Sequence, residues 1–302
     1  DKDLGQQAAE AIRNQLQKQT NTRDLVVVPK ADITNSLTSS GYQPTEALAP
    51  GDAKALATLV RAPQYLEGTV SKTPTGYKID SRLIISRDMN RGQVLPSAQA
   101  AKLDDAASQV AKAIKDARQQ LPGEGTGQNA GAQGKYQEGV TAARAAMSGN
   151  PNANIAAACL ADAYAGLKMD DSVIAVSERI RATDPRNIIA LRRLAEEYKL
   201  KNDTPKELNI LTLLAAADPT NIKLIQDVIA QMAQTGHADQ AVPLMRDLIP
   251  NNPGDPQLLN LAWPVYLNAK DYNDAITCRN EMVRVATAAA TADFYARRAG
   301  PY

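Results

Sequence analysis

Four prolines recur at a constant step of 34 residues in the second half of the chain, and this period constrains the fold more than any other feature. They are Pro151, Pro185, Pro219 and Pro253, and each follows an Asn or an Asp. A period of this length is typical of a repeated helix pair whose apolar side can be buried only against the next pair. The spacing therefore predicts a stacked helical solenoid over more than half of the chain.

Apolar side chains repeat with the same period. If each unit is counted from 154, 188, 222 and 256, the fourth, seventh and eleventh positions lie three to four residues apart and form one stripe of a first helix. A second stripe follows in each unit, as expected for the second helix of a pair. The first-helix stripes are Ala157, Leu160, Tyr164; Leu191, Leu194, Tyr198; Ile225, Val228, Met232; and Leu259, Ala262, Tyr266.

This pattern resembles the tetratricopeptide repeat family, in which the eighth position is small where the two helices touch. Ala161 and Ala195 fit, whereas Ile229 and Trp263 depart, and Pro264 after Trp263 leads us to expect a kinked last unit. The resemblance implies an all-α superhelix over 135–302 that binds other proteins. Its expected parts are a half repeat 135–153, repeats 154–187, 188–221, 222–255 and 256–287, and a capping helix 288–299.

Residues 1–121 mix helix and strand periods and predict an α+β domain, a small sheet with helices on one side. The 122–134 segment, which is rich in glycine and lacks an apolar period, predicts a flexible linker to the repeats. Its alternating glycines do not predict a phosphate loop, because such loops follow a strand and this segment follows a helix. The expected elements are a helix along Leu4–Leu16, a short strand 24–29, a helix 52–59, a hairpin of 65–71 and 77–85, a turn at 88–92 and a closing helix 98–121.

The order of these elements resembles the amino-terminal domain of TolB and its relatives, including the FlgO and CsgG groups. The residues that carry the resemblance are Ala9–Leu16, Leu25–Val28, Ala55–Arg61 and, above all, Ala62–Val70 followed by Gly76–Ile79. The resemblance implies a protein of the bacterial envelope, periplasmic or extracellular.

One departure from that family concerns the start of the chain. In the family an apolar strand precedes the first helix, and here the chain begins at the helix itself. Either residues upstream of Asp1 belong to the parent protein, which we favour, or another chain donates a strand to the open sheet edge. The second alternative makes the sheet edge a candidate binding site.

Charge and composition exclude several functions. The net charge is +1, and the chain holds one Phe and one Trp, so neither the basic excess nor the aromatic platforms of a nucleic-acid binder are present. No run of 18 apolar residues exists, so the sequence predicts no membrane span. The partners expected are other proteins or peptides.

A search for catalytic or metal-binding patterns finds none. His237 is the only histidine, which excludes a histidine pair for a metal and leaves no Ser-His-Asp set elsewhere. It lies beside Gly236 in an expected turn, where we interpret it as an exposed residue. Cys159 and Cys278 lie on helices about three repeats apart, too far for a disulfide, and are interpreted as small core residues. The sequence therefore predicts a protein that is not an enzyme and needs no cofactor or metal.

The concave face of the solenoid is the predicted partner-binding site. In the repeat family, polar positions of the first helices point into this groove, and Arg192 is our strongest candidate because a fixed guanidinium pairs well with a carboxylate. The lysine-asparagine clamp that some members use is absent, since Asp162 and Glu196 replace asparagine. The predicted groove residues are Asp162, Arg192, Glu196, Lys199, Lys223, Gln226, Gln257, Asn260 and Asn268.

Two functional hypotheses remain. The first is a non-catalytic interaction scaffold, a structural or assembly subunit of a bacterial cell-envelope complex. The second is the sensory or regulatory portion of a larger signalling protein, a kinase, a cyclase or a transcription regulator, because the same two modules resemble parts of such proteins.

Overall fold

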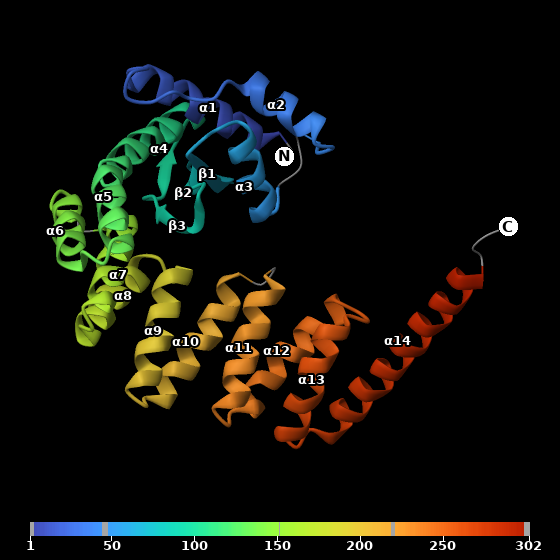
Figure 1. Cartoon of the computed structure of the whole chain (residues 1–302). Helices are drawn as coiled ribbons and strands as arrows, with labels where there is room; N and C mark the ends of the chain where they lie inside the picture. The colour runs from blue at the N-terminus through green and yellow to red at the C-terminus, as the bar shows by residue number, and fades with distance from the viewer. Residues whose placement is uncertain (1–2, 44–47, 151, 219–220, 299–302) are drawn as a thin grey trace. The chain divides into compact units, whose positions relative to one another are not determined.

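The computed structural model describes residues 3–43, 48–150, 152–218 and 221–298. The chain forms two compact units, one that ends at Glu197 and one that begins at Tyr198. The amino-terminal part of the first unit holds three helices, a sheet and a fourth helix (Figure 1). These elements are α1 (Leu4–Gln19), α2 (Lys30–Ser39), α3 (Pro50–Leu59), β1 (Gln64–Thr73), β2 (Gly76–Ile85), β3 (Asp88–Val94), β4 (Ala98–Ala100) and α4 (Leu103–Arg118).

The sheet is antiparallel and is built around β2. β1 pairs with the whole of β2, from Gln64 opposite Ile85 to Thr73 opposite Gly76. On the other side of β2, β3 pairs with its second half and β4 with its first half. Among the described residues, β1 therefore pairs on one side only and is an edge strand.

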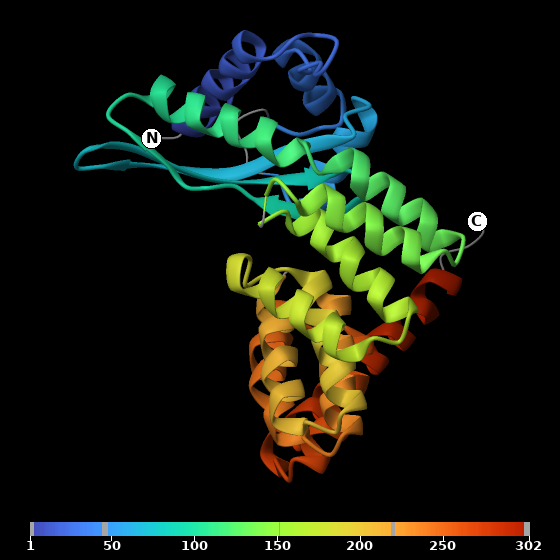
Figure 2. The same ribbon diagram turned by 90° about the vertical axis from the view of Figure 1, so that its left-hand side faces the viewer.

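The core of this part lies between the sheet and two helices. Alternate residues of β2, Ile79 and Leu83, face a cluster that includes Ile12 of α1 and Val110 of α4. Figure 2 shows α1 and α4 on one side of the sheet. The predicted α+β fold, a small sheet with helices on one side, is confirmed.

A glycine closes the hairpin between β1 and β2. Gly76 has a φ of 137°, a region that other residues rarely adopt, and a Cβ there would lie 2.2 Å from the carbonyl oxygen of Ala100. Both the turn and the close approach of β4 therefore require glycine at this position.

Three predictions about residues 1–121 are wrong in detail. Residues 25–29 form neither a helix nor a strand, so the strand expected at 24–29 is absent there, and an unexpected helix, α2, follows directly. The second connection is tighter than expected, because β3 starts at Asp88 and the turn falls at Ser86 and Arg87. Residues 98–100 form β4, and the closing helix begins only at Leu103.

The linker predicted at 122–134 is a helix instead. The helices here are α5 (Leu121–Ala132), α6 (Tyr136–Met147), α7 (Asn154–Gly166) and α8 (Asp170–Thr183). Glycines of α5 and α6 allow close packing between helices: a Cβ on Gly123 of α5 would lie 2.5 Å from the Cβ of Ala146, and one on Gly139 of α6 would lie 3.3 Å from the Cβ of Ala163. α5 and α6 thus form a complete helix pair, where a linker and a half repeat were expected.

The 34-residue period appears directly in the backbone. Residues in the left-handed region recur at the turn inside each helix pair, and the next residue's N–H bonds to the carbonyl of the eleventh repeat position, which closes each first helix. Because Gly134 belongs to this series, α5 and α6 are the first of five pairs in the described chain. The turn residues are Gly134, Lys168, Asn202, Gly236 and Lys270.

The remaining pairs confirm the predicted solenoid. They are α9 (Ile188–Leu200) with α10 (Thr204–Ala217), α11 (Ile222–Gln234) with α12 (Ala238–Asn251), and α13 (Pro256–Asn268) with α14 (Tyr272–Arg298). The predicted stripe residues are buried in every first helix. Two of the four periodic prolines, Pro151 and Pro219, lie outside the described residues.

The last pair differs from prediction. α14 runs for 27 residues without a break, so the expected separate capping helix at 288–299 is the continuation of α14 up to Arg298, with residue 299 outside the described chain. α13 continues through Pro264 as one helix, and the kink expected there stays a prediction. None of the described helices has the length and hydropathy needed to cross a membrane.

Candidate partner-binding surface

The sheet and the first repeats are joined by polar contacts, which we call the polar joint: Arg82, Arg91, Gln93, Gln120, Asn154, Ala156, Asp162 and Asp184. Arg82 of β2 pairs with the buried Asp184, which follows α8, at 3.2 Å. Arg91 of β3 pairs with Asp162 of α7 at 2.6 Å. These links fix the second helix pair to the sheet.

Two buried glutamines complete the start of α7. Helix N-termini leave N–H groups without partners, and α7 receives no cap from the side chain that precedes it. The Oε1 of Gln93 accepts from the N–H of Asn154 at 2.8 Å, and the Oε1 of Gln120 accepts from the N–H of Ala156 at 3.0 Å. The Nε2 of Gln120 donates to Gln93 at 3.1 Å. The cap therefore comes from β3 and the end of α4.

Arg91 is the most deeply buried cation of the joint. Its side chain is 10% exposed and donates to Asp88 at 3.2 Å and to the Sγ of Cys159 at 3.1 Å, besides Asp162. Burial opposes its charge, yet the neighbouring Cys159, Asp162 and Asp88 more than offset this and raise the pKa of Arg91. A charge held among acceptors in this way stabilises the contact only while its partners are present.

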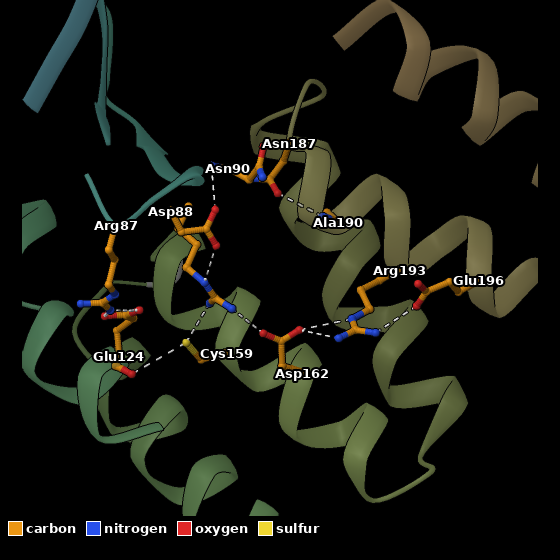
Figure 3. A network of polar contacts seen from close by, with 11 residues as sticks. Arg87, Asp88, Asn90, Glu124, Cys159, Asp162, Asn187, Ala190, Arg193 and Glu196 are labelled. Atoms are coloured by element: carbon orange, nitrogen blue, oxygen red, sulfur yellow. Dashed lines mark hydrogen bonds and ion pairs between the residues drawn. The ribbon is translucent and has the colours of Figure 1, made fainter. Parts of the chain in front are cut away.

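The row of charges continues from α7 to α9, as Figure 3 shows. Asp162 also accepts two hydrogen bonds from Arg193, the shorter at 2.9 Å, and Arg193 pairs with Glu196 at 2.9 Å. The exposed fraction of the side chain rises from 30% at Asp162 to 61% at Glu196. The row therefore starts inside the joint and ends on the surface of α9.

A second acid is buried in the helix that replaces the expected linker. The side chain of Glu124 is 2% exposed and accepts from the guanidinium of Arg87, in the turn before β3. The backbone carbonyl of Glu124 lies 3.9 Å from the Sγ of Cys159. This ion pair ties α5 to the sheet, as the polar joint ties α7.

The structure separates the predicted groove residues into different roles. Asp162 is held by two arginines and belongs to the joint, whereas Arg192 is exposed and makes no hydrogen bond or ion pair with the described residues. Glu196 is exposed and paired with Arg193, and Lys223 is paired with Asp227. Gln226 is half-buried, and exposed side chains are found at Lys199, Gln257, Asn260 and Asn268. A common groove for these residues stays a prediction.

Sequence reasoning missed the residues that hold the joint together. Arg193, next to our favoured Arg192, makes the contacts to Asp162, and Arg91, Gln93 and Gln120 were not singled out. The sequence does not mark Gln120, because it stands beside Gln119 and before a segment without an apolar period.

The chemistry available in the described residues is limited. Burial raises the pKa of the Cys159 thiol to about 12, against a smaller opposing effect of Arg91, so the thiol is neutral at ordinary pH and a poor nucleophile. His237 is half-buried, not exposed as predicted, and its Nδ1 has no hydrogen-bond partner in the described chain. No group of acids, histidines and cysteines among the described residues is arranged to hold a metal ion.

The second unit contains an apolar cavity of about 580 Å³ beside α14. Leu259, Tyr266 and Cys278 contribute to its lining, and Arg246 and Arg284 also line it. Arg246 pairs with Asp271 at 2.6 Å and with Asp274 at 2.7 Å. The lining of the cavity is therefore largely apolar. The charge of Arg246 is balanced by Asp271 and Asp274.

Comparison with known proteins finds likeness in structure only. No family model matches the chain, and no curated protein matches it. A crystal structure of MamA protein is similar over 58% of this chain and 95% of its own, with 13% identity and a TM-score of 0.43. TTC0263, a thermophilic TPR protein of Thermus thermophilus, is similar over 57% of this chain and 99% of its own, with 19% identity and a TM-score of 0.35.

Proposed function

We propose that this chain is a non-catalytic scaffold that binds other proteins through the exposed faces of its helix pairs. The observation that carries the proposal is the polar joint, which fuses a sheet with an open edge to a solenoid of helix pairs. A solenoid whose first pairs are fixed in this way presents surface at constant geometry, and pre-organised surfaces lose less entropy on binding.

The charged face of α9 is the part of the solenoid that we expect a partner to contact. Arg192 is exposed and free of described partners, while Arg193 and Glu196 beside it are paired. An unpaired guanidinium favours a carboxylate on the partner. We therefore propose an acidic peptide or protein surface as the ligand of this face.

Location in the bacterial cell envelope, periplasmic or extracellular, is the setting we propose for this scaffold. Its support is the resemblance of residues 1–121 to the TolB amino-terminal domain. In that setting the chain is a structural or assembly subunit.

The test is native purification of the protein from its source, with the wild type compared against two variants. Arg192→Glu reverses an exposed charge on α9, and Lys112→Glu reverses an exposed charge on α4 as a matched control. We expect a partner at fixed stoichiometry with the wild type and the control, and at least tenfold less with Arg192→Glu. A protein that purifies alone at every salt concentration would contradict the scaffold function.

A further inference from the structure

The outer edge of β1 carries a row of backbone groups without partners in the described chain. The N–H of Ser86 bonds to the carbonyl of Pro63 at 2.9 Å, which makes this the hydrogen-bonded register of the antiparallel pair. Bonds to β2 therefore fall on 65 and every second residue up to Thr73, the residue that flanks the two-residue turn. The N–H and C=O of Leu66, Gly68 and Val70 point away from β2.

A second unpaired stretch of backbone lies nearby. Residues 25–29 form neither a helix nor a strand, and none of Val26, Val27 and Val28 shares a backbone hydrogen bond with another described residue. Val26 is 74% exposed, which is unusual for a valine in a run of apolar residues. The segment has the β-branched, apolar sequence of a strand, but no described residue pairs with it.

Both stretches face the same core. One cluster, which includes residues of α1 and α4, contacts Leu66 and Val70 of β1 as well as Leu25 and Val27. At one end Arg118 bridges them, because its guanidinium donates to the side chain of Gln64 at 2.9 Å and to the carbonyl of Asp24 at 3.3 Å. The backbones at Gln64 and Asp24 are thus separated by a guanidinium and a glutamine side chain. Two directly paired strands would be only about 4.8 Å apart.

The two helices between residues 25–29 and β1 in the sequence, α2 and α3, bury few side chains. α2 buries Leu37 alone, and Ala57 is the one buried residue of α3 for which burial is described. Leu59, at the end of α3, is 59% exposed. Exposed apolar side chains and an unpaired strand edge are both features of surfaces that bind another chain.

We propose that the place between β1 and residues 25–28 is a slot that accepts one β-strand from a protein partner. The strand hydrogen-bonds to the outward groups of Leu66, Gly68 and Val70 and gives Val26–Val28 the pairing they lack. Its alternate side chains face the shared cluster and are apolar; those between them are polar and uncharged, because Glu67 and Lys72 leave the edge with no net charge. This inference rests on the scaffold function proposed above and identifies a second class of ligand for it.

The experiment uses the whole chain and a fluorescent nine-residue peptide that alternates valine and threonine between terminal lysines, with anisotropy as the readout. Val70→Pro removes one outward N–H, which proline lacks, while the bonds to β2 at residues 69 and 71 stay. Val70→Ala loses the same side chain and keeps the N–H, so it is the matched control. We expect the peptide to bind the wild type and Val70→Ala, and to bind Val70→Pro at least tenfold more weakly.

Hydrogen exchange gives the second readout. The amides of Leu66, Gly68 and Val70 should exchange rapidly in the free protein and become protected with the peptide, while those of residues 65, 67 and 69 are protected throughout. Equal binding to Val70→Pro and Val70→Ala, or a peptide that leaves the outward amides unprotected, would overturn the slot. A dimer of the chain that Val70→Pro dissociates would make a second copy the occupant and would also overturn it. The scaffold function is tested separately, because Arg192→Glu leaves this edge unchanged.

Discussion

Replacement of Gln120 by alanine tests whether the polar joint holds the sheet and the solenoid together. Gln120 is 1% exposed, and its side chain makes hydrogen bonds with Ala156, Gln93 and the carbonyl of Ala117. The variant leaves the N–H of Ala156 buried without a partner, which costs about 1–3 kcal/mol, and removes the hydrogen bond that Gln120 donates to Gln93, worth about 1 kcal/mol. We expect a total loss of about 2–4 kcal/mol in the free energy of unfolding.

The assay is thermal unfolding followed by circular dichroism and calorimetry. For a unit of this size each kcal/mol shifts Tm by about 2–4 °C, so Gln120→Ala should lower the Tm of the first unit by roughly 5–15 °C. Gln119→Ala, at the exposed neighbouring position, is the control and should stay within about 0.5 kcal/mol of the wild type. Gln120→Met fills the space without hydrogen bonds and separates the loss of bonding from the loss of volume.

Two results would refute this reasoning. The first is a Tm for Gln120→Ala that equals that of Gln119→Ala, since the buried hydrogen bonds would then contribute nothing. The second is a wild-type protein in which residues 3–118 and helices α5–α8 unfold in separate transitions, because a fixed joint requires them to unfold together.

Three further predictions concern other parts of the chain. Cys159 should not react with a thiol reagent at pH 8 until the protein unfolds, as measured by absorbance with and without denaturant. Gly76→Ala should lower stability by more than 1 kcal/mol in chemical denaturation, whereas Gly131→Ala, in a helix with open space around it, should raise it by about 0.5–1 kcal/mol. Burial raises the pKa of Cys159 and of Tyr266 to about 12, above their ordinary values of 9.0 and 10.0. The folded state therefore favours the neutral forms, and this contribution to stability is complete below pH 9 and is lost as the pH rises to 12. A Tm that stays constant between about pH 9 and 12 would contradict this prediction.

The repeat period was predictable because each unit contains its own set of apolar residues at the same positions. Every first helix carries its own stripe, so residues such as Leu191 and Leu194 identify their helix without knowledge of their neighbours. The same frame, counted back one period from 154, places a first helix at 120 and its eleventh position at Ala130, as the structure has it. The sequence analysis missed the helix at Leu121–Ala132 because of its glycines. Composition alone does not show whether a glycine makes the backbone flexible or allows two helices to pack closely.

The polar joint could not be predicted in the same way. Gln93, Gln120 and Ala156 come from a strand, the end of one helix and the start of another, and only the tertiary fold brings their hydrogen-bonding groups together. The strand expected at 24–29 failed for a related reason. Strand propensity describes a side chain that suits a sheet, whereas strand formation also needs a neighbouring strand, and none of the described residues pairs with this segment.

The joint also limits which charges a partner can recognise. Asp162, predicted to line a groove, is held by Arg91 and Arg193, so its charge is neutralised within the unit. Arg192 pairs with no acid of the described chain, so its guanidinium is available to a partner. Because the joint fixes α7 to β3, a strand bound at β1 and a carboxylate bound at Arg192 would be held at a constant separation within the first unit. A partner that carries both a free strand and a carboxylate on one rigid surface would therefore bind more tightly than either ligand alone. Gln120→Ala loosens the joint, so it should reduce this gain in affinity while the strand alone and the carboxylate alone bind as before.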